Sequence, residues 1–512
     1  MVGGVVALAL ARELAPVLAG VVVTARAGST MASELGNMRV TEQIDAITTM
    51  GVSPVQYLVV PRVVATTAML PLLAICFGIV GRRRAGRGQA RERLEQRTQP
   101  DLAAIYEPLL TSRSYDPGLR VPASKTGLLA GMGMTEKQGG SDVRANTTTA
   151  TPAGDGTWRL RGHKWFTSAP MCDLFLVLAQ APAGLSCFLV PRVLPDGRRN
   201  TFRIQRLKNK LGNRSNASAE PEFDSTFAEL VGEQGRGIRT ILEMVSMTRL
   251  DCVIGSSSLM RAATVQAIHH AAHRHAFGGP LLAKPLMQNV LADLAVESEA
   301  ATTLMLRLAG AVDRAQRGDQ QEQAFKRLAV AVGKYWVTKR TPNVVAEALE
   351  CLGGNGYVEE SGLPRLYREA PLNSIWEGSG NVNALDVLRA MGREPECVEA
   401  FFAEVALADD PRIAAATVGV QALLGQVEES VARRLVERLA LLLQGSLLVR
   451  HAPAEVADAF CASRLAGDWG HAFGTLPAGL DLPAIIGRAA PDGAGGPAVP
   501  SYEEGATSRL VS

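Results

Sequence analysis

The stretch TWRLRGHKWFTSAPMCDLFLVLAQAPAGLSCFLVP (157–191) decides the first half of the fold. It holds three of four short runs that are typical of β-strands, and Gly, Pro and Asp turns separate them, as at 153–156. The four runs are Thr157–Leu160, Leu174–Ala179, Leu185–Pro191 and Phe202–Leu207. Residues 125–225 are therefore predicted to form a small antiparallel β-barrel or sandwich.

The chain changes character at about residue 236, where apolar residues begin to recur with a helical period. Long Ala, Leu and Val stretches with few Gly or Pro run through 238–273, 282–315, 322–352 and 381–391. Such lengths are typical of a bundle of long helices. Residues 397–490 indicate further helix, and the Gly/Pro/Ser-rich 491–512 indicates a disordered tail. The prediction is an α+β fold that is mainly α, with the β domain before the bundle.

The amino-acid composition excludes several classes of protein and of binding partner. The 512 residues carry 53 Lys and Arg against 50 Asp and Glu, a net charge of +3, so no global case exists for a nucleic-acid partner. A hydrophobic content of 47% excludes a mainly disordered chain. The seven cysteines form no CxxC pair, which indicates isolated thiols in a reducing compartment. No Cys/His cluster or HExxH occurs, so we expect no metal site.

Residues 1–81 account for much of the chain's hydrophobic excess. Val63 to Gly81 is a run of 19 uncharged residues followed directly by Arg82, Arg83 and Arg84. Length and flanking charge fit a membrane-spanning helix with its basic end in the cytoplasm. The alternative is a buried helix, or two short helices divided at Pro71. Residues 82–101, rich in Arg, indicate a solvated linker.

Two motifs of the β region combine glycine, hydroxyl and aromatic side chains. GMGMTEKQGGSD (131–142) has a GxG but no third glycine at dinucleotide-binding spacing, so a Rossmann fingerprint is rejected. Its amides and hydroxyls can still contact a polar ring edge, although an ordinary turn is the alternative. In Trp165-Phe166-Thr167-Ser168, aromatic rings beside hydroxyls suit a flat heteroaromatic ligand. A strand with a buried Trp explains that motif equally well.

Two motifs of the helical region frame a candidate base. In Ile375-Trp376-Glu377-Gly378-Ser379-Gly380-Asn381, a carboxylate stands between Trp and Gly, just before a helical pattern. Loss of solvation beside an aromatic wall would let Glu377 act as a base, and a carboxylate facing the helix dipole is the alternative. LGGNGY (352–357) ends a helix, where its glycines permit a C-cap or the close approach of a phosphate.

Taken together and in this order, these segments resemble the acyl-CoA dehydrogenase family, and most closely its AidB branch. The resemblance covers about 102–480 and rests on these phrases: MTEKQGGSD (134–142), GHKWFTS (162–168), RLKNKLGNRSNAS (206–218), MTRLDC (247–252), RHAFGGPL (274–281), LGGNGY (352–357) and LPRLYREAPLNSIWEGSGN (363–381). It implies a middle β domain at 102–235, a C-terminal helical domain at 236–392 and an AidB-like helical region at 393–490.

The resemblance also implies an FAD-binding enzyme that oxidises an acyl-CoA thioester, usually as a homotetramer. Glu377 would remove the α-proton while a hydride leaves the β-carbon for the flavin. Residues that would hold the flavin ring and its edge are Met132, Gly133, Met134, Thr135, Gly140, Ser141, Phe166, Thr167 and Ser168. Residues that would wrap the flavin and substrate are Ile375, Trp376, Gly378, Ser379 and Asn381. Residues that would reach the FAD of a neighbouring subunit are Arg274, Phe277, Gly353 and Gly354.

AidB-type proteins are associated with the response to alkylation damage and with DNA binding by a C-terminal helical region. Here residues 397–490 contain seven Arg, no Lys and eleven Asp or Glu. A net acidic stretch is a poor match for duplex phosphate, so DNA is at most a weak expected partner. A local arginine face at Arg433, Arg434 and Arg438 is the part that could serve it.

The N-terminal segment resembles a different family. ARAGSTMASELGNMRVTEQIDAITTMGVSPVQYLVVPRV (25–63) is similar to the MlaE-type permease of lipid-transporting ABC systems. This resemblance stops near Gly81, and most of the first helical domain of a dehydrogenase is missing. A recombined gene, a frameshift or a misassembled sequence explains the junction best, and we expect weak flavin retention. The implied location is cytoplasmic, with a tether to the inner membrane through 1–81, and a lipid-transport permease fragment is the alternative function.

Overall fold

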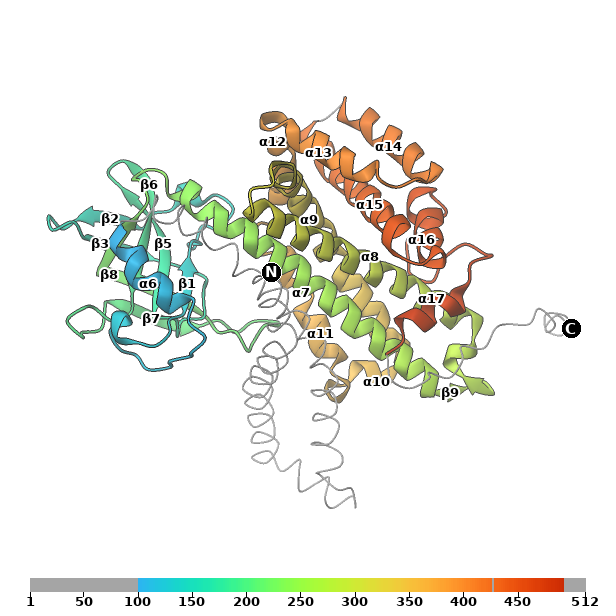
Figure 1. Cartoon of the computed structure of the whole chain (residues 1–512). Coiled ribbons are helices and arrows are strands. Elements are labelled where there is room, and N and C mark those ends of the chain that lie inside the picture. Colours follow the sequence, from blue (N-terminus) through green and yellow to red (C-terminus); the bar gives the residue numbers. More distant parts are fainter. Residues whose placement is uncertain (1–99, 426–427, 492–512) are drawn as a thin grey trace, which may run out of the picture. The chain divides into compact units, whose positions relative to one another are not determined.

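The computed structural model describes residues 100–425 and 428–491 (Figure 1). By its contacts the chain divides into two units, 1–93 and 94–512, and every described residue belongs to the second. The predicted apolar helices of 1–81, most of the Arg-rich linker and the predicted tail after residue 491 lie outside the described residues. Within the described part, no helix is both long and apolar enough to cross a bilayer.

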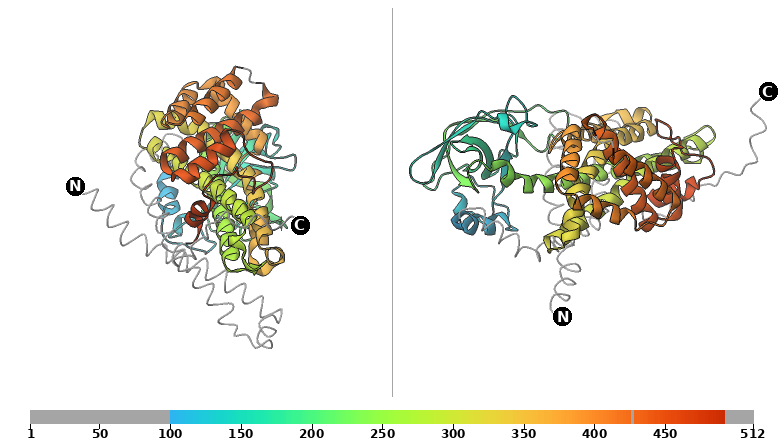
Figure 2. Two further views of the ribbon diagram at one scale, coloured as in Figure 1. Left: turned by 90° about the vertical axis from the view of Figure 1, so that its right-hand side faces the viewer. Right: turned by 90° about the horizontal axis from the view of Figure 1, so that it is seen from above.

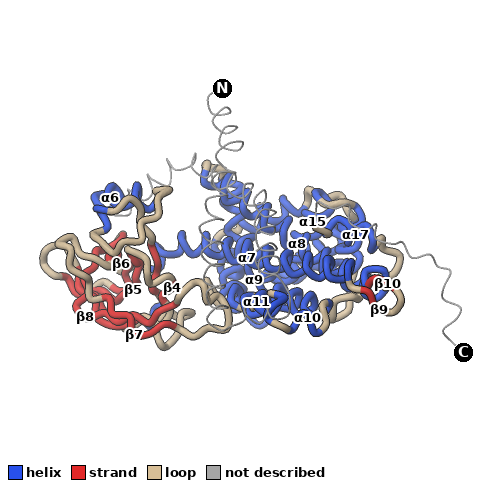
Figure 3. The backbone as a smooth tube through the Cα atoms, turned by 90° about the horizontal axis from the view of Figure 1, so that it is seen from below, coloured by secondary structure: helices blue, strands red, loops and turns tan. Residues whose placement is uncertain are grey.

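The β domain follows a short helix, α6 (Pro100–Leu110), and contains an eight-stranded sheet. Its strands are β1 (Ala130–Gly133), β2 (Thr149–Pro152), β3 (Trp158–His163), β4 (Thr167–Ser168), β5 (Leu174–Ala181), β6 (Gly184–Pro191), β7 (Phe202–Leu207) and β8 (Ser218–Val231). The four strands predicted from sequence appear as β3, β5, β6 and β7 within a few residues of the expected bounds. Figure 3 shows the strands of this domain in red.

The sheet is mixed, which corrects the prediction of an antiparallel one. The long strand β8 pairs antiparallel with β3, β4, β6 and β7. However, β1 pairs parallel with β5 along its whole length, with Ala130 opposite Leu174, and β2 touches β5 in parallel at Thr149. Antiparallel direction is imposed by tight hairpins, and β1 reaches β5 only after three intervening strands, so no turn fixes its direction.

Aromatic side chains fill the interior of the β domain. Phe175, Phe202 and Phe223 are buried, with Phe175 stacked on Phe202 at 4.7 Å between ring centroids. Trp158 packs against Phe188 at 5.3 Å. These residues come from five different strands, so the aromatic core ties the sheet together across its layers.

The second half is a bundle of helices, of which the longest match the predicted stretches closely. They are α7 (Gly237–His273), α8 (Pro285–Gln316), α9 (Gln320–Cys351) and α12 (Gly380–Arg393). A small hairpin of β9 (His275–Ala276) and β10 (Gly279–Pro280) joins α7 to α8. Two short helices, α10 (Gly354–Tyr357) and α11 (Leu363–Glu369), lie between α9 and α12. The predicted helical bundle is confirmed.

The C-terminal helices share the same apolar core as α7, α8 and α9. They are α13 (Glu396–Val405), α14 (Pro411–Leu424), α15 (Ala432–His451), α16 (Ala454–Phe460), a π-helical turn at Cys461–Leu465, and α17 (Leu482–Ala489). In both views of Figure 2 these orange and red helices lie against the green and yellow ones. Residues 396–489 therefore form a packed part of the bundle.

A buried cluster of four charged side chains fastens this C-terminal part to the bundle. Arg464, on the π-helical turn, donates to Asp293 and, at 3.2 Å, to Glu297, both on α8. Arg340 on α9 donates to Glu297 at 3.0 Å. Asp293, Glu297 and Arg464 are each at most 2% exposed. Two cations and two carboxylates balance within the cluster, as buried charges require.

Candidate active site

Glu377 stands in the short loop that precedes α12. Its backbone has a φ of +56°, the left-handed region that residues other than glycine rarely adopt, and Gly378 follows with a φ of +100°. The carboxylate oxygen Oε2 accepts a hydrogen bond of 2.6 Å from Thr248 Oγ1 on α7. The loop thus presents this half-buried carboxylate in a fixed direction, at the cost of local backbone strain.

Three side chains hold the backbone carbonyls around Glu377, and we call Arg249, Lys334 and Asn383 the carbonyl clamp. Arg249 Nε donates to the carbonyl of Glu377 at 3.2 Å, and Lys334 Nζ donates to that of Trp376 at 2.9 Å and to that of Gly378. Asn383 Nδ2 donates to the carbonyls of Gly378 and Ser379. Four successive carbonyls therefore have a donor.

The other predicted residues of this loop have distinct surroundings. Ile375 is exposed, and Trp376 is half-buried with its indole nitrogen donating to Asn373 at 3.1 Å. Ser379 is the residue before the first turn of α12, and Asn381 is exposed within that turn. An exposed isoleucine and a half-buried tryptophan thus precede the carboxylate along the chain, and a serine and an asparagine follow it.

Burial shapes the charges beneath the loop. Burial lowers the pKa of Lys334 to about 8, with Cys252 and Glu377 opposing the shift and Arg249 adding to it. Burial likewise raises the pKa of the Cys252 thiol to about 12, so this neighbouring cysteine stays protonated and unreactive at neutral pH. Arg249 is itself fixed by an ion pair of 2.5 Å to Asp386 on α12.

The two predicted flavin motifs of the β domain lie side by side. Thr135 accepts a backbone hydrogen bond of 2.8 Å from Trp165, and a Cβ built on Gly133 would lie 3.2 Å from Thr167 Oγ1. The hydroxyl of Thr167 is buried and has no hydrogen-bond partner among the described residues. Gly140 and Ser141 are exposed. A buried hydroxyl without a partner and a glycine at close approach fit a polar ring edge.

A buried ion pair that sequence reasoning missed supports this loop. Lys164 Nζ lies 2.7 Å from Glu136 Oε1, with both side chains fully buried, and Glu136 also accepts from the backbone amides of Thr147 and Thr148. Burial by itself would raise the pKa of Glu136, but hydrogen bonds from Lys164 and Thr148 outweigh it and lower the pKa to about 2. Burial lowers the pKa of Lys164 to about 8. Both groups are charged at neutral pH.

Lys208 is a second residue that sequence reasoning passed over. Its ammonium group lies 3.3 Å from the ring centroid of Trp165 and 4.4 Å from that of Phe166. The ring of Phe166 is 48% exposed. Ser168 Oγ lies 3.4 Å from Ser218 Oγ, which completes an aromatic, cationic and hydroxyl surface beside the loop. The sequence feature that could have pointed to Lys208 is the phrase RLKNKLGNRSNAS, in which Lys208 lies two residues before Lys210.

The residues predicted to serve a neighbouring subunit lie elsewhere. Arg274 ends α7, twenty-six residues after Thr248, or about 39 Å along the helix. Phe277 is 90% exposed with a φ of +53°, and Gly353 and Gly354 are exposed just after α9. The structure does not bring these four residues to Glu377. Their service to a second copy stays a prediction.

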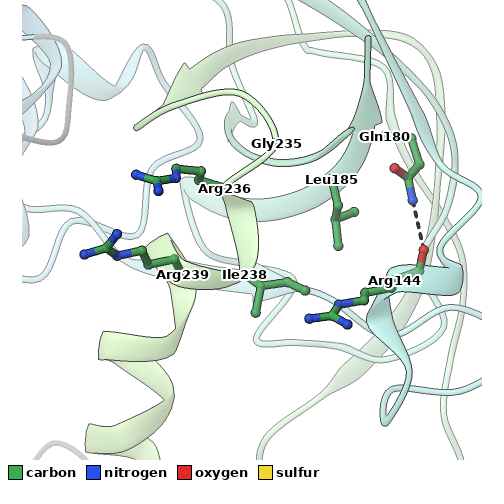
Figure 4. Close-up of a pocket in the computed structure, with 7 residues that line it drawn as sticks. All are labelled: Arg144, Gln180, Leu185, Gly235, Arg236, Ile238 and Arg239. Carbon is green, nitrogen blue, oxygen red and sulfur yellow. Dashed lines mark hydrogen bonds between the residues drawn. The ribbon is translucent and has the colours of Figure 1, made fainter. Parts of the chain in front are cut away.

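A further cavity, of about 490 Å³, opens where α7 begins (Figure 4). Its lining contains three arginines and no carboxylate: Arg144, Gln180, Leu185, Gly235, Arg236, Ile238 and Arg239. Gln180 Nε2 donates to the backbone carbonyl of Arg144 at 3.0 Å, which fixes one wall. The first turn of α7 has no side-chain cap and so adds unpaired amides to the positive charge. Sequence reasoning did not find this cavity.

Most arginines of the C-terminal region are paired with carboxylates. Arg412 pairs with Asp410 and Asp458, and Arg450, Arg464 and Arg488 each have an acidic partner. Arg433 donates to the hydroxyl of Tyr335. The exposed Arg433, Arg434 and Arg438 of the predicted arginine face have no such carboxylate partner among the described residues, so free positive charge for a phosphate backbone is confined to that face. Among the described residues there is also no group of three or more His, Cys, Asp or Glu that could hold a metal ion.

Comparison with known families explains this arrangement. Residues 131–226 match the acyl-CoA dehydrogenase middle domain, and residues 235–392 match the acyl-CoA dehydrogenase C-terminal domain. The part of the chain from 131 to 392 therefore belongs to the acyl-CoA dehydrogenase family. Residues 1–84 match a different family, Permease MlaE.

Within the dehydrogenase family the resemblance to the AidB branch is confirmed. The chain is 50% identical over 357 residues to the putative acyl-CoA dehydrogenase AidB of Escherichia coli, which covers 69% of this chain and 65% of that protein. It is 33% identical to acyl-CoA dehydrogenase family member 11 of Caenorhabditis elegans, covering 63% and 58%. The chain thus spans less than two thirds of either relative.

Solved structures agree on the fold. The structure of Caenorhabditis elegans ACDH-11 in complex with C11-CoA has a TM-score of 0.67 at 29% identity, covering 78% of this chain and 74% of that one. An acyl-CoA dehydrogenase of Bacillus anthracis complexed with FAD has a TM-score of 0.56 at 18% identity, covering 72% and 69%. The second likeness concerns the fold alone.

Proposed function

We propose that this chain is an FAD-dependent acyl-CoA dehydrogenase-like oxidoreductase in which Glu377 is the catalytic base. The observation that carries the proposal is the presentation of Glu377. Its carboxylate is bonded to Thr248, and its backbone is held in a left-handed conformation. Strain of this kind persists where the surroundings over-determine it, which is common at active sites. The likeness to AidB and to a protein solved with a CoA thioester supports the same activity.

The residues present fit FAD. The partnerless Thr167 hydroxyl, the half-exposed Phe166 ring and the exposed amides of Gly140 and Ser141 would hold the flavin from the β domain. Met132, Gly133, Met134, Thr135 and Ser168 would complete that wall. Ile375, Trp376, Gly378, Ser379 and Asn381 would close the site from the bundle. When bound, FAD would accept the hydride that leaves the β-carbon of the substrate.

The chain's own contribution is to hold and use one carboxylate. The α-proton of a thioester is only weakly acidic, so its removal requires a base fixed at the right distance and angle. Thr248 keeps the Glu377 carboxylate oriented before substrate arrives, and the carbonyl clamp keeps the loop from relaxing. The proton taken from the substrate would stay on the Glu377 carboxyl until the product leaves.

The arginine-lined cavity would receive the phosphates of the substrate. Arg239 precedes Thr248 by nine residues on α7, which is about 14 Å of helix. An extended pantetheine arm spans a comparable distance. Arginine is well suited to bind phosphate groups, and the open first turn of α7 adds to the attraction. We therefore assign a CoA thioester, rather than a free acid, as the substrate class.

The domain division, the assembly and the N-terminal segment remain proposals. We propose domains at 102–235, 236–392 and 393–490, and a homo-oligomer in which Arg274, Phe277, Gly353 and Gly354 reach the FAD of a second copy. The permease-like residues 1–84 have no part in this chemistry, and we propose that they are a recombined fragment. A carbonate wash of membranes from expressing cells tests tethering: retention supports it, and release supports a cytoplasmic protein.

An absorption titration tests the proposed function. Because weak flavin retention is expected, the purified chain is supplied with excess FAD; it should then show a bound-flavin spectrum, and one member of a panel of acyl-CoAs of increasing length should bleach it without oxygen. Glu377→Gln should retain the flavin and lose the bleaching. Glu396→Gln, an exposed carboxylate on α13, is the control and should bleach as the parent does. A flavin-loaded protein that no acyl-CoA bleaches would show the proposal to be wrong.

A further inference from the structure

Lys334 is the charged, fully buried member of the carbonyl clamp. It lies in the middle of α9 with 1% of its surface exposed, and its ammonium group donates to the carbonyls of Trp376 and Gly378. Those two carbonyls belong to the residues on either side of Glu377. No sequence motif pointed to Lys334, although a lysine inside the apolar run LAVAVGKYWV is unusual.

We propose that Lys334 is a positioning residue that holds Glu377 in its left-handed backbone conformation by bridging the carbonyls of Trp376 and Gly378. The inference rests on the proposed role of Glu377 as the base. A single donor group shared between two carbonyls fixes the peptide plane that precedes Glu377 and the plane that follows Gly378, while Arg249 holds the plane between them. Without it the loop can relax toward φ values that other residues prefer, and the carboxylate turns away.

The other clamp residues cannot substitute for Lys334. Arg249 reaches only the carbonyl of Glu377 itself, and Asn383 reaches those of Gly378 and Ser379. The carbonyl of Trp376 has no other donor among the described contacts than Lys334. Removal of the ammonium group would therefore free the N-terminal side of the loop while the C-terminal side stays attached to α12.

The charges around Lys334 give its effect a dependence on pH. Cys252 and Arg249 face it from α7, Lys339 lies five residues further along α9, and Glu377 faces it from the loop. Burial lowers its pKa to about 8, so the ammonium group loses its charge as pH rises through that value. A neutral amine donates weaker hydrogen bonds than an ammonium group. The loop should loosen between about pH 7 and pH 9.

Amide hydrogen exchange of the full-length, flavin-loaded chain tests this positioning. The amides of Ile375, Trp376 and Asn383 are hydrogen-bonded to carbonyls of the same segment, so they report its order. In Lys334→Met these amides should exchange at least tenfold faster than in the parent at pH 7. In the parent, the protection of these amides from exchange should decrease from pH 7 to pH 9, and in Lys334→Met it should not depend on pH in this way. Thr338→Val is the control, because Thr338 is equally buried one turn on and bonds only within α9.

A kinetic measurement follows from the same variants. The rate of flavin reduction by the best acyl-CoA should fall about a hundredfold in Lys334→Met, with little change in its Kd. Lys334→Gln keeps a donor without the charge and should recover part of both effects. If Lys334→Met does not fold, Lys334→Gln is measured alone, and exchange of the Ile375 and Trp376 amides that is still faster than in the parent supports the clamp.

Unchanged exchange of the segment in a folded Lys334→Met, or in Lys334→Gln when the methionine variant does not fold, overturns the inference, whatever the activity. Equal acceleration in Thr338→Val overturns it as well, because it would show a general loosening of α9. If no acyl-CoA reduces the flavin of the parent chain, the proposed function fails, and the exchange data still decide whether Lys334 holds the loop.

Discussion

The buried charge cluster predicts a large loss of stability in Arg464→Met. Arg464 donates to Asp293 and Glu297, and its removal leaves Asp293 with only the backbone amide of Gly474 at 3.0 Å. Glu297 keeps Arg340. Breaking one side of a buried ion pair costs about 3–5 kcal/mol, because an uncompensated charge stays behind. Methionine has a similar length but also loses the cation–π contact of the guanidinium with the ring of Trp469.

The corresponding change in melting temperature can be worked out. An unfolding entropy of about 2.1 cal/mol/K per residue over roughly 390 described residues gives about 0.8 kcal/mol/K. A loss of about 4 kcal/mol then lowers Tm by about 5 °C. Thermal unfolding followed by far-ultraviolet circular dichroism, at one protein concentration and with saturating flavin, measures this shift.

Two further variants make the measurement decisive. Arg488→Met removes an exposed ion pair with Glu299, also on α8, and should lower Tm by about 1 °C or less. Asp293→Asn combined with Arg464→Met removes the orphaned charge and should recover part of the loss. If Arg464→Met melts within 1 °C of the parent, the cluster does not fasten the C-terminal region and the reasoning is refuted.

Three other outcomes follow from the site. The pKa of Glu136 is lowered to about 2 from an ordinary 4.5, which contributes stability that is fully present above pH 4.5 and is lost as pH falls toward 2. The difference in unfolding free energy between the parent and Glu136→Gln should therefore shrink over that range. A constant difference would contradict the pairing of Glu136 with Lys164. Thr248→Val removes a hydrogen bond to a charged group worth about 1.5–3 kcal/mol, so flavin reduction should slow about ten- to a hundredfold; an unchanged rate would show that Glu377 orients itself. Arg239→Gln should raise the Kd of the acyl-CoA severalfold, and more at low salt, without slowing reduction at saturation; an unchanged Kd would remove the phosphate assignment of the cavity.

The parts of the fold that sequence predicted well are those governed by local pattern. The long helices α7, α8 and α9 follow the 3.6-residue period closely, so their bounds differ from the predicted ones by only a few residues. The strand β8 was missed because SAEPEFDSTFAELV mixes Pro and acidic residues into a partly exposed face. The parallel pairing of β1 with β5 depends on long-range geometry, which no local period encodes.

The residues of the candidate site also fall into those that local sequence could predict and those that it could not. The motif around Glu377 was visible because its residue types are unusual and contiguous. Its partners were not, since Thr248 and Lys334 lie 129 and 43 positions away, and only packing of α7 and α9 brings them together. The pairing of Glu136 with Lys164 has the same origin. A charged residue inside an apolar helical run, as at Lys334, was the signal that could have found one of them.

The π-helical turn at Cys461–Leu465 makes the length of the chain as important as its composition at that point. A π-turn contains one residue more than an α-turn, so it behaves as a single inserted residue within a helix. Deleting Ala462 would restore the α-helical register and rotate Arg464 by about 100° away from Asp293 and Glu297. The ion cluster therefore depends on the number of residues in this turn. It accepts conservative substitutions around it, but a shift of the helical register by one residue would separate the segment that follows from α8.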